Sequence, residues 1–341
     1  MLDGWIGENT VGAVTLDRAA LDAWKLARLQ ETLDYARRHS SFYRERFPDC
    51  QIGSFEEFAA LPFTTVDDLR LYGSKMLCIP PNQVDRVKTL STSGSTGAPK
   101  RIYFSAGDQE RTIDYFFHGM AEFTGPGSRV MSLFPGESSG SLNDLLSRAL
   151  TRLGAQPLLF GYPPPERYPA LLNAILEQKA DFLVGAAESV AGAARRSAEL
   201  GYAERLAGQL KGVLLAAAYV SPENRADIAR LWRCPVYEHY SMTETALGGA
   251  VGCSAPRGYH EWESGVYYEI VDPASGQPVP EGKYGEVVVT TLGQEAMPFL
   301  RYRTGDISRF LPGPCPCGSI LRRLDRVAER GVRKHFANSP P

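Results

Sequence analysis

Hydroxyl side chains alternate with glycines in the segment Thr92–Lys100, which reads TSGSTGAPK. Glycines can adopt positive φ and let the backbone approach a ligand closely, hydroxyls can donate to phosphate oxygens, and a lysine adds a compact positive charge. The spacing of a Walker loop is absent, and a shorter match could be an ordinary Ser/Gly turn. The length of the pattern favours a phosphate-binding loop. Its residues are Thr92, Ser93, Gly94, Ser95, Thr96 and Gly97, with Lys100 at its end.

A second group of chemically capable residues consists of cysteines and a histidine. Cys253 and His260 lie close together in VGCSAPRGYH, and Cys315 and Cys317 lie in the turn CPCG. Three sulfurs and one imidazole match a closed, tetrahedral structural zinc site, which leaves no position for a catalytic water. The alternative is that they are unrelated buried or turn residues. The other cysteines, Cys50, Cys78 and Cys234, have no such neighbours, and we expect them to be apolar fillers.

The loop Thr92–Lys100 resembles the signature of adenylate-forming enzymes, a class that includes acyl-CoA synthetases, luciferases and peptide-synthetase adenylation domains. Phenylacetate-CoA ligases are the most similar group. Two further segments occur in the family's order, YEHYSMTE at Tyr237–Glu244 and YRTGD at Tyr302–Asp306. Relatives also carry Cys, His and CPCG in this order, which supports the zinc site. The resemblance extends to about residue 330 and so covers nearly the whole chain.

The resemblance implies a role for each matching residue. Tyr240 would stack on adenine, the Thr243 hydroxyl would reach the α-phosphate, and the Glu244 carboxylate would bind Mg²⁺. Asp306 would accept hydrogen bonds from both ribose hydroxyls. Arg330 lies near the family's hinge arginine and is a candidate ribose or phosphate contact.

The sequence departs from the family pattern in the nucleotide motifs. Ser241 stands where the family usually has glycine, and Ala218 stands where phenylacetate-CoA ligases usually have the glutamate of GAEP. We therefore expect an altered nucleotide pocket. Of the histidines outside the metal set, His239 is the one of interest, because it lies inside the second motif.

The reaction implied by the resemblance starts with attack of a carboxylate on the α-phosphorus of ATP. Pyrophosphate leaves, and the acyl-adenylate passes to a thiol, usually that of CoA. The expected cofactors are ATP/AMP, Mg²⁺ and structural Zn²⁺, and the expected substrate is a small carboxylic acid. Small side chains in the acid pocket would leave room for a bulky or aryl acid. The residues expected to line this pocket are Phe134, Gly136, Gly185, Ala216, Ala217 and Ala218.

Relatives carry a further C-terminal domain that rotates and delivers a lysine to the adenylation site. The sequence stops at RGVRKHFANSPP, so we expect this lid to be absent and adenylation by the chain alone to be slow. A separate lid-domain protein and a carrier protein are therefore candidate partners, and a homodimer is left open. Two alternatives remain: transfer to a partner protein, as in acyl-protein synthetases, and a non-catalytic nucleotide-binding or scaffold protein.

The elements that must position these residues follow from hydrophobic periodicity. Helical spacing over Leu21–Phe47 predicts amphipathic helix, and the stretch from Phe55 to Leu71 predicts short helices separated by Pro62. Beyond Lys100, apolar runs alternate with helical stretches, which is typical of a parallel sheet covered by helices. After about residue 260, short strands and turn clusters predict a smaller β-rich subdomain.

The predicted fold is therefore layered α/β, with parallel sheets covered by helices, a smaller β-rich subdomain and no C-terminal lid. The expected organisation is a helical N-terminal segment over 1–90, a nucleotide-binding core over 91–250, a β-rich subdomain over 251–330 and a tail over 331–341.

Composition excludes several functional classes. The 341 residues are 43% hydrophobic and 22% charged with a net charge of -2, which argues against a nucleic-acid partner. The N-terminus MLDGWIGENT lacks the basic and apolar regions of a signal peptide, and no apolar run is long enough to span a membrane. We expect a cytoplasmic protein with reduced thiols.

Overall fold

The computed structural model describes residues 2–90, 99–136, 138–255 and 258–327. The chain divides into two compact units. Unit 1 contains Thr112–Ser241 and Val251–Tyr259, and unit 2 contains Leu2–Arg111, Met242–Ala250 and the chain from His260 on. The four-part division predicted from the sequence stays a prediction.

Unit 1 is built around a parallel sheet with the strand order β4-β3-β5-β6-β7. Every residue of β5 and β6 is buried, which explains their uninterrupted apolar sequences, since helices cover both faces of such a sheet. The strands are β3 (Arg129–Ser132), β4 (Gln156–Leu159), β5 (Phe182–Gly185), β6 (Gly212–Leu215) and β7 (Val236–Ser241). The predicted parallel sheet is thereby confirmed.

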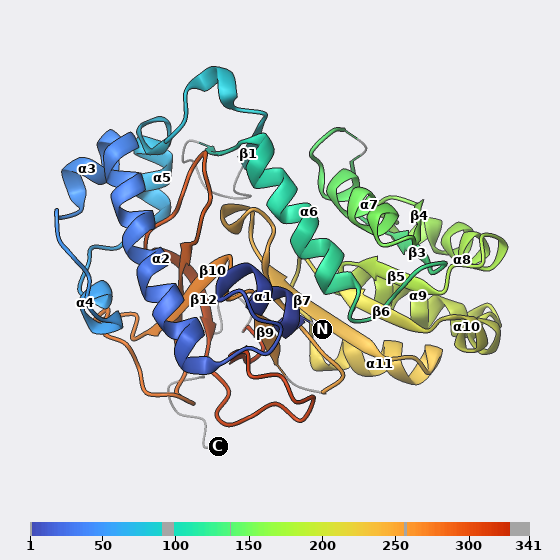
Figure 1. Cartoon of the computed structure of the whole chain (residues 1–341). Coiled ribbons are helices and arrows are strands. Elements are labelled where there is room, and N and C mark those ends of the chain that lie inside the picture. Colours follow the sequence, from blue (N-terminus) through green and yellow to red (C-terminus); the bar gives the residue numbers. More distant parts are fainter. Residues whose placement is uncertain (1, 91–98, 137, 256–257, 328–341) are drawn as a thin grey trace. The chain divides into compact units, whose positions relative to one another are not determined.

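Helices alternate with these strands along the chain (Figure 1). The hydroxyl of Ser141 caps α7 by accepting from Asp144 N. Ser221 caps α11, and Pro222 occupies the first turn of that helix. These helices are α7 (Leu142–Arg152), α8 (Tyr168–Glu177), α9 (Ala187–Glu199), α10 (Ala203–Gln209) and α11 (Pro222–Trp232), with the short η3 (Pro165–Arg167) before α8 and most of α6 (Ala106–Met120) before α7.

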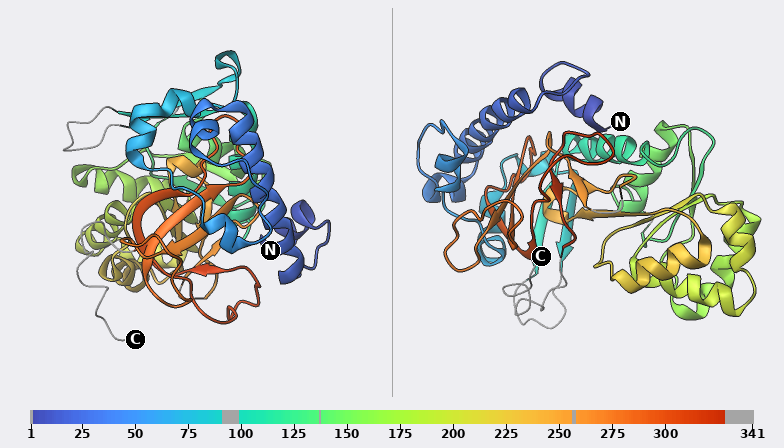
Figure 2. Two further views of the ribbon diagram at one scale, coloured as in Figure 1. Left: turned by 90° about the vertical axis from the view of Figure 1, so that its left-hand side faces the viewer. Right: turned by 90° about the horizontal axis from the view of Figure 1, so that it is seen from below.

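Unit 2 combines N-terminal helices with antiparallel strands, which can be followed as blue helices and orange to red strands in Figure 2. The strand β11 lies between β10 and β12, and β1 pairs with β2. Its strands are β1 (Arg86–Leu90), β2 (Lys100–Phe104), β10 (Val266–Val271), β11 (Gly285–Thr291), β12 (Tyr302–Ser308) and β13 (Arg323–Leu324), together with most of β8 (Gly249–Val251) and β9 (Tyr259–Glu261). This smaller antiparallel sheet confirms the predicted β-rich part.

The helices of unit 2 match the predicted periodicity. The Thr65 and Asp68 side chains form a capping box, so a new helix starts shortly after Pro62, as expected. The helices are α1 (Leu2–Thr10), α2 (Arg18–His39), α3 (Ser41–Arg46), α4 (Phe55–Ala59) and α5 (Val66–Tyr72), with the short turns η1 (Gly73–Met76), η2 (Pro81–Gln83) and η4 (Thr243–Thr245).

Buried ion pairs join distant segments of unit 2. Arg301, which is 1% exposed, binds both carboxylate oxygens of Glu269 on β10 and also donates to the Leu61 carbonyl. Lys25 Nζ on α2 lies 2.6 Å from Glu263 Oε2. Burial alone would raise the pKa of Glu263, but the positive charges of Lys25 and Arg18 outweigh it and lower this pKa to about 2. Glu263 therefore stays charged at neutral pH.

We predict that Arg301→Leu lowers the free energy of unfolding by about 3–5 kcal/mol, because Glu269 would remain buried without its partner. Urea titration followed by circular dichroism measures the change. The matched control is Arg28→Leu, which removes an ion pair to Glu31 that is exposed on the surface of α2. Its effect should stay below about 1 kcal/mol. Equal effects of the two substitutions would contradict the prediction.

Candidate active site

The strongest contact among the predicted site residues joins Lys100 to Glu244. Lys100 begins β2 and Glu244 lies in η4, and Lys100 Nζ is 2.5 Å from Glu244 Oε1. Glu244 is only 4% exposed, so its carboxylate needs a partner to remain charged. The lysine that follows the predicted phosphate loop thus meets the carboxylate predicted to bind Mg²⁺.

Tyr302 is a third member of this group, and no role was predicted for it from the sequence. It begins β12, is 3% exposed, and donates its hydroxyl to Glu244 Oε1 at 3.1 Å. A buried tyrosine normally requires a partner for its hydroxyl, and its position at the start of YRTGD was the available signal. All three side chains belong to unit 2.

The turn that carries Glu244 is held in a strained conformation. Thr245 Oγ1 donates to the carbonyls of Met242 and Gly248, and Ala246 and Leu247 follow with φ of 53° and 64°. Residues with a Cβ avoid this left-handed region, at a cost of about 1–3 kcal/mol each. Such strain is common at functional sites, and here the hydrogen bonds of Thr245 hold the turn next to the carboxylate. The predicted Thr243 lies in the same turn, and its carbonyl accepts from Ala246 N at 3.1 Å.

Asp306 lies on β12, the strand that begins with Tyr302. Its carboxylate is largely buried, with the residue 6% exposed, and its backbone N–H donates to Thr304 Oγ1 at 3.0 Å. Gly305, with a φ of 75°, precedes it and donates its N–H to Glu286. The backbone around Asp306 is thus fixed, and its role as the ribose acceptor stays a prediction.

Several predicted residues lie outside the described part of the chain. They are Thr92, Ser93, Gly94, Ser95, Thr96, Gly97 and Arg330. Their predicted contacts with phosphate and ribose therefore remain predictions.

In unit 1, three polar side chains meet at the end of β7. His239 Nε2 lies 3.0 Å from the Tyr115 hydroxyl, and Ser241 Oγ lies 3.5 Å from His239 Nδ1. Burial lowers the pKa of His239 to about 4, so the ring is neutral at pH 7. Ser241, which replaces the family's usual glycine, thus supplies a polar neighbour for His239. The predicted adenine contact Tyr240 lies between them in sequence on β7 and is partly exposed.

The first residues predicted for the acid pocket follow β3. Phe134 is buried at 4% exposure, and its carbonyl accepts from the side-chain amide of Asn143. Gly136 has a φ of 101°, and its carbonyl accepts from Ser141 Oγ at 3.3 Å. The positive φ alone accounts for a glycine at this position.

The remaining predicted pocket residues lie at the ends of β5 and β6. A Cβ at Gly185 would lie 3.0 Å from Val190 Cγ2 and 3.1 Å from Leu133 Cβ, so close packing requires a small residue there. Ala216 is buried, whereas Ala217 and Ala218 are exposed, and Ala217 has a φ of 66°. The acid pocket itself stays a prediction.

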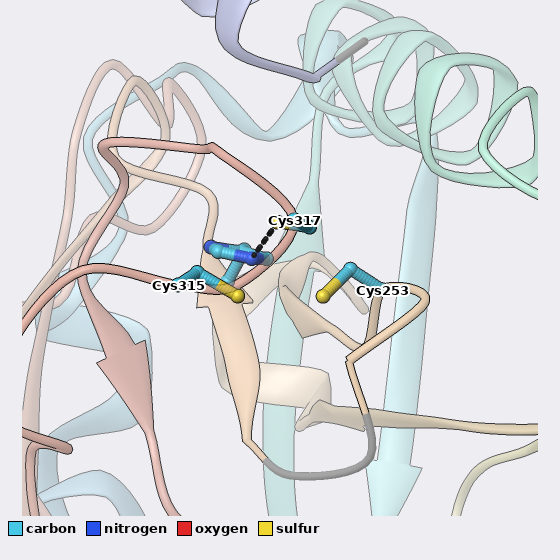
Figure 3. A group of neighbouring side chains, drawn as sticks. Cys253, Cys315 and Cys317 are labelled. Carbon is cyan, nitrogen blue, oxygen red and sulfur yellow. Dashed lines mark hydrogen bonds between the residues drawn. The ribbon is translucent and has the colours of Figure 1, made fainter.

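The four predicted metal ligands lie together (Figure 3). The ligand atoms of Cys253, His260, Cys315 and Cys317 are all within 4.8 Å of one another, and Cys317 Sγ is 3.3 Å from His260 Nε2. Ligands that share a tetrahedral zinc ion are about 3.5 Å apart, given Zn–S and Zn–N distances of about 2.3 and 2.0 Å. Burial lowers the pKa of His260, which favours the neutral imidazole that binds metals. The residues therefore fit a structural zinc ion.

Comparison with known proteins agrees with this fold and identifies the family. Residues 67–296 match the model of the AMP-binding enzyme family, and the chain belongs to that family. It is similar to phenylacetate-coenzyme A ligase from Pseudomonas putida, with 26% identity over 332 residues, 92% of this chain and 72% of the relative. The corresponding ligase from Escherichia coli (strain K12) is 27% identical over 329 residues, 91% of this chain and 71% of the relative.

Solved structures show the same fold. A 2-hydroxyisobutyryl-CoA ligase in complex with 2-HIB-AMP and CoA superposes with a TM-score of 0.84 at 24% identity, covering 95% of this chain and 70% of that one. The curated relatives are acid–thiol ligases of the AMP-forming type. The family and the α/β fold class predicted from the sequence are thus confirmed. Within the described residues, no helix has the length and apolarity needed to cross a bilayer.

We predict that Tyr302→Phe weakens binding of ATP in the presence of Mg²⁺ by about 10- to 100-fold, because a hydrogen bond to a charged group contributes about 1.5–3 kcal/mol. Isothermal titration calorimetry measures the affinity. Tyr72→Phe, at an exposed position of α5 in the same unit, is the control and should bind as the wild type does. An unchanged affinity in Tyr302→Phe would show that the hydroxyl does not position Glu244.

Proposed function

We propose that this chain activates a carboxylic acid with ATP to form an acyl-adenylate. The contact of Lys100 with Glu244, completed by Tyr302, carries the proposal. It brings together residues from the three segments that resemble the nucleotide motifs of the family. A buried carboxylate flanked by a lysine provides both charges needed to hold a metal-bound polyphosphate.

In the proposed reaction, a carboxylate oxygen of the acid attacks the α-phosphorus of ATP and pyrophosphate leaves. Glu244 would hold Mg²⁺, which neutralises charge on the phosphate oxygens when bound. Lys100 would then exchange its contact with Glu244 for the phosphates, and the hydroxyls of Thr92–Gly97 would donate to them. These fixed charges and donors would stabilise the negative charge that builds up as pyrophosphate departs.

The substrate and the acceptor are finer parts of the proposal. The curated relatives are phenylacetate ligases, which supports an aryl acid as substrate. Solved neighbours in complex with an acyl-AMP and CoA support CoA as the acceptor of the acyl group. A carrier-protein thiol is the alternative acceptor, and trapping of a labelled acyl group on a partner protein would distinguish it from CoA.

The central test is exchange of labelled pyrophosphate into ATP with a panel of aryl and aliphatic acids. We expect acid-dependent exchange by the wild type. Glu244→Gln and Lys100→Met should each lower the rate by about 10²- to 10³-fold, because each removes charge stabilisation from the transition state. Lys88→Met, at an exposed position of β1, is the matched control and should retain the wild-type rate.

A non-catalytic nucleotide-binding protein is the second candidate. It is favoured by Ala218, which stands where related ligases usually have a glutamate. In that case calorimetry would detect binding of ATP or AMP, while exchange would be absent for every acid tested. Binding without exchange would therefore replace the first proposal with the second.

We further propose that Cys253, His260, Cys315 and Cys317 bind structural zinc. Purified protein should contain about one zinc ion per chain. The free energy of unfolding measured with free zinc at 100 times its Kd should exceed that of the chelator-treated protein by about 2.7 kcal/mol. Metal analysis and thermal unfolding measure both effects. Cys317→Ser should lose the zinc, whereas Cys50→Ser should keep it. Zinc-free wild-type protein with unchanged stability would contradict the site.

A further inference from the structure

The N-terminal helix α1 contacts the loop that carries two of the proposed zinc ligands. Asp3, in the first turn of α1, accepts hydrogen bonds through Oδ1 from Ser319 Oγ and from Ile320 N, each at 3.0 Å. Ser319 and Ile320 follow Cys317 in the chain, separated from it by Gly318 alone. One carboxylate oxygen thus fixes the segment that leaves the cysteine turn.

A backbone hydrogen bond closes the cysteine turn. Gly318 N donates to the Cys315 carbonyl at 3.0 Å, and Gly318 has a φ of 89°. Ser319 Oγ also accepts from Leu321 N at 3.1 Å, which makes Ser319 the link between Asp3 and the following segment. Arg323 Nη2 donates to the Gly313 and Pro314 carbonyls just before Cys315, and Ser319 holds the segment that follows Cys317.

A second contact joins α1 to the strand that carries His260. Trp5 stacks on Trp262, with the ring centroids 6.1 Å apart and an interplanar angle of 14°. Trp262 is 5% exposed and lies two residues after His260. A Cβ at Gly248 would lie 2.2 Å from the Trp262 ring, so the ring packs directly against the turn that follows Glu244. The helix thus contacts both metal-ligand segments of unit 2, and Trp262 connects it to the turn that follows Glu244.

We infer that Asp3 is a positioning residue for the zinc cluster, and that zinc binding and the packing of α1 stabilise each other. The inference rests on the zinc site proposed above. Loss of a hydrogen-bond partner of a metal ligand typically changes metal affinity by about 10- to 100-fold, and Asp3, which holds the residues next to the cysteine turn, should act near the lower end of this range. Thermodynamic linkage makes this coupling reciprocal. The free energy by which packed α1 strengthens zinc binding must equal the free energy by which bound zinc stabilises the packing of α1.

The first experiment measures zinc affinity of the full chain by competition with a chromogenic chelator. Asp3→Ala should raise the Kd for zinc by about 10-fold or more. Asp3→Asn keeps a carbonyl oxygen that can accept both hydrogen bonds, so its Kd should lie closer to that of the wild type. Glu8→Ala is the matched control, since it removes an exposed carboxylate from the same helix without altering the contacts to Ser319 and Ile320.

The second experiment needs no variant and covers the case in which Asp3→Ala does not fold. Amide hydrogen exchange of residues 2–10 in the wild-type protein should become faster when zinc is removed and slow again when zinc is restored. The inference would be overturned if Asp3→Ala and the wild type bound zinc with equal affinity, or if the exchange rate of the α1 amides did not change on zinc removal. Either result would leave the zinc site itself intact. A wild-type protein that binds no zinc would remove the site itself.

Discussion

The organisation of unit 2 depends on the need to neutralise carboxylates that are removed from water. Glu244 is 4% exposed, and an isolated charge at such a depth would be too unfavourable to persist. Lys100 and Tyr302 supply the neutralising charge and the hydrogen bond, and they come from segments far from Glu244 in sequence. Burial of a charged Glu244 is therefore tied to the assembly of unit 2, since its partners come from segments that only the fold brings together.

The same constraint explains the charged residues inside the rest of this unit. Glu269 and Glu286 lie on the fully buried strands β10 and β11, and they bind Arg301 and Arg303 respectively. Arg301 has a positive φ of 47° and precedes β12, so the backbone at this strand start is set by where the guanidinium must reach. Ion pairs of this type contribute little net stability, because desolvation offsets most of the attraction, whereas removal of one partner is costly.

Features that depend on a local sequence pattern, or on the residue types that bind a metal, could be predicted from the sequence alone. The apolar runs of β5 and β6, the helix after Pro62 and the cysteine–histidine set could all be predicted, because periodicity, capping and metal-ligand chemistry are visible in short stretches. Tyr302 and Asp3 were not predicted. Their roles come from single partners, Glu244 and Ser319, that lie far away in the chain, and nothing in their own neighbourhood identifies those partners. Gly185 had a packing explanation that spacing alone could not reveal.

The order in which the segments occur in the chain has a consequence for biosynthesis. Unit 2 needs both Leu2–Arg111 and the chain from His260 on, while Thr112–Ser241 of unit 1 is continuous. At a synthesis rate of about 5–20 residues per second, the N-terminal helices are made roughly 15 to 60 seconds before their last partner strands. During that interval Asp22, on α2 itself, is the carboxylate partner available to Arg18 and Lys25. The contacts of both side chains with Glu263 can form only after that residue has been synthesised.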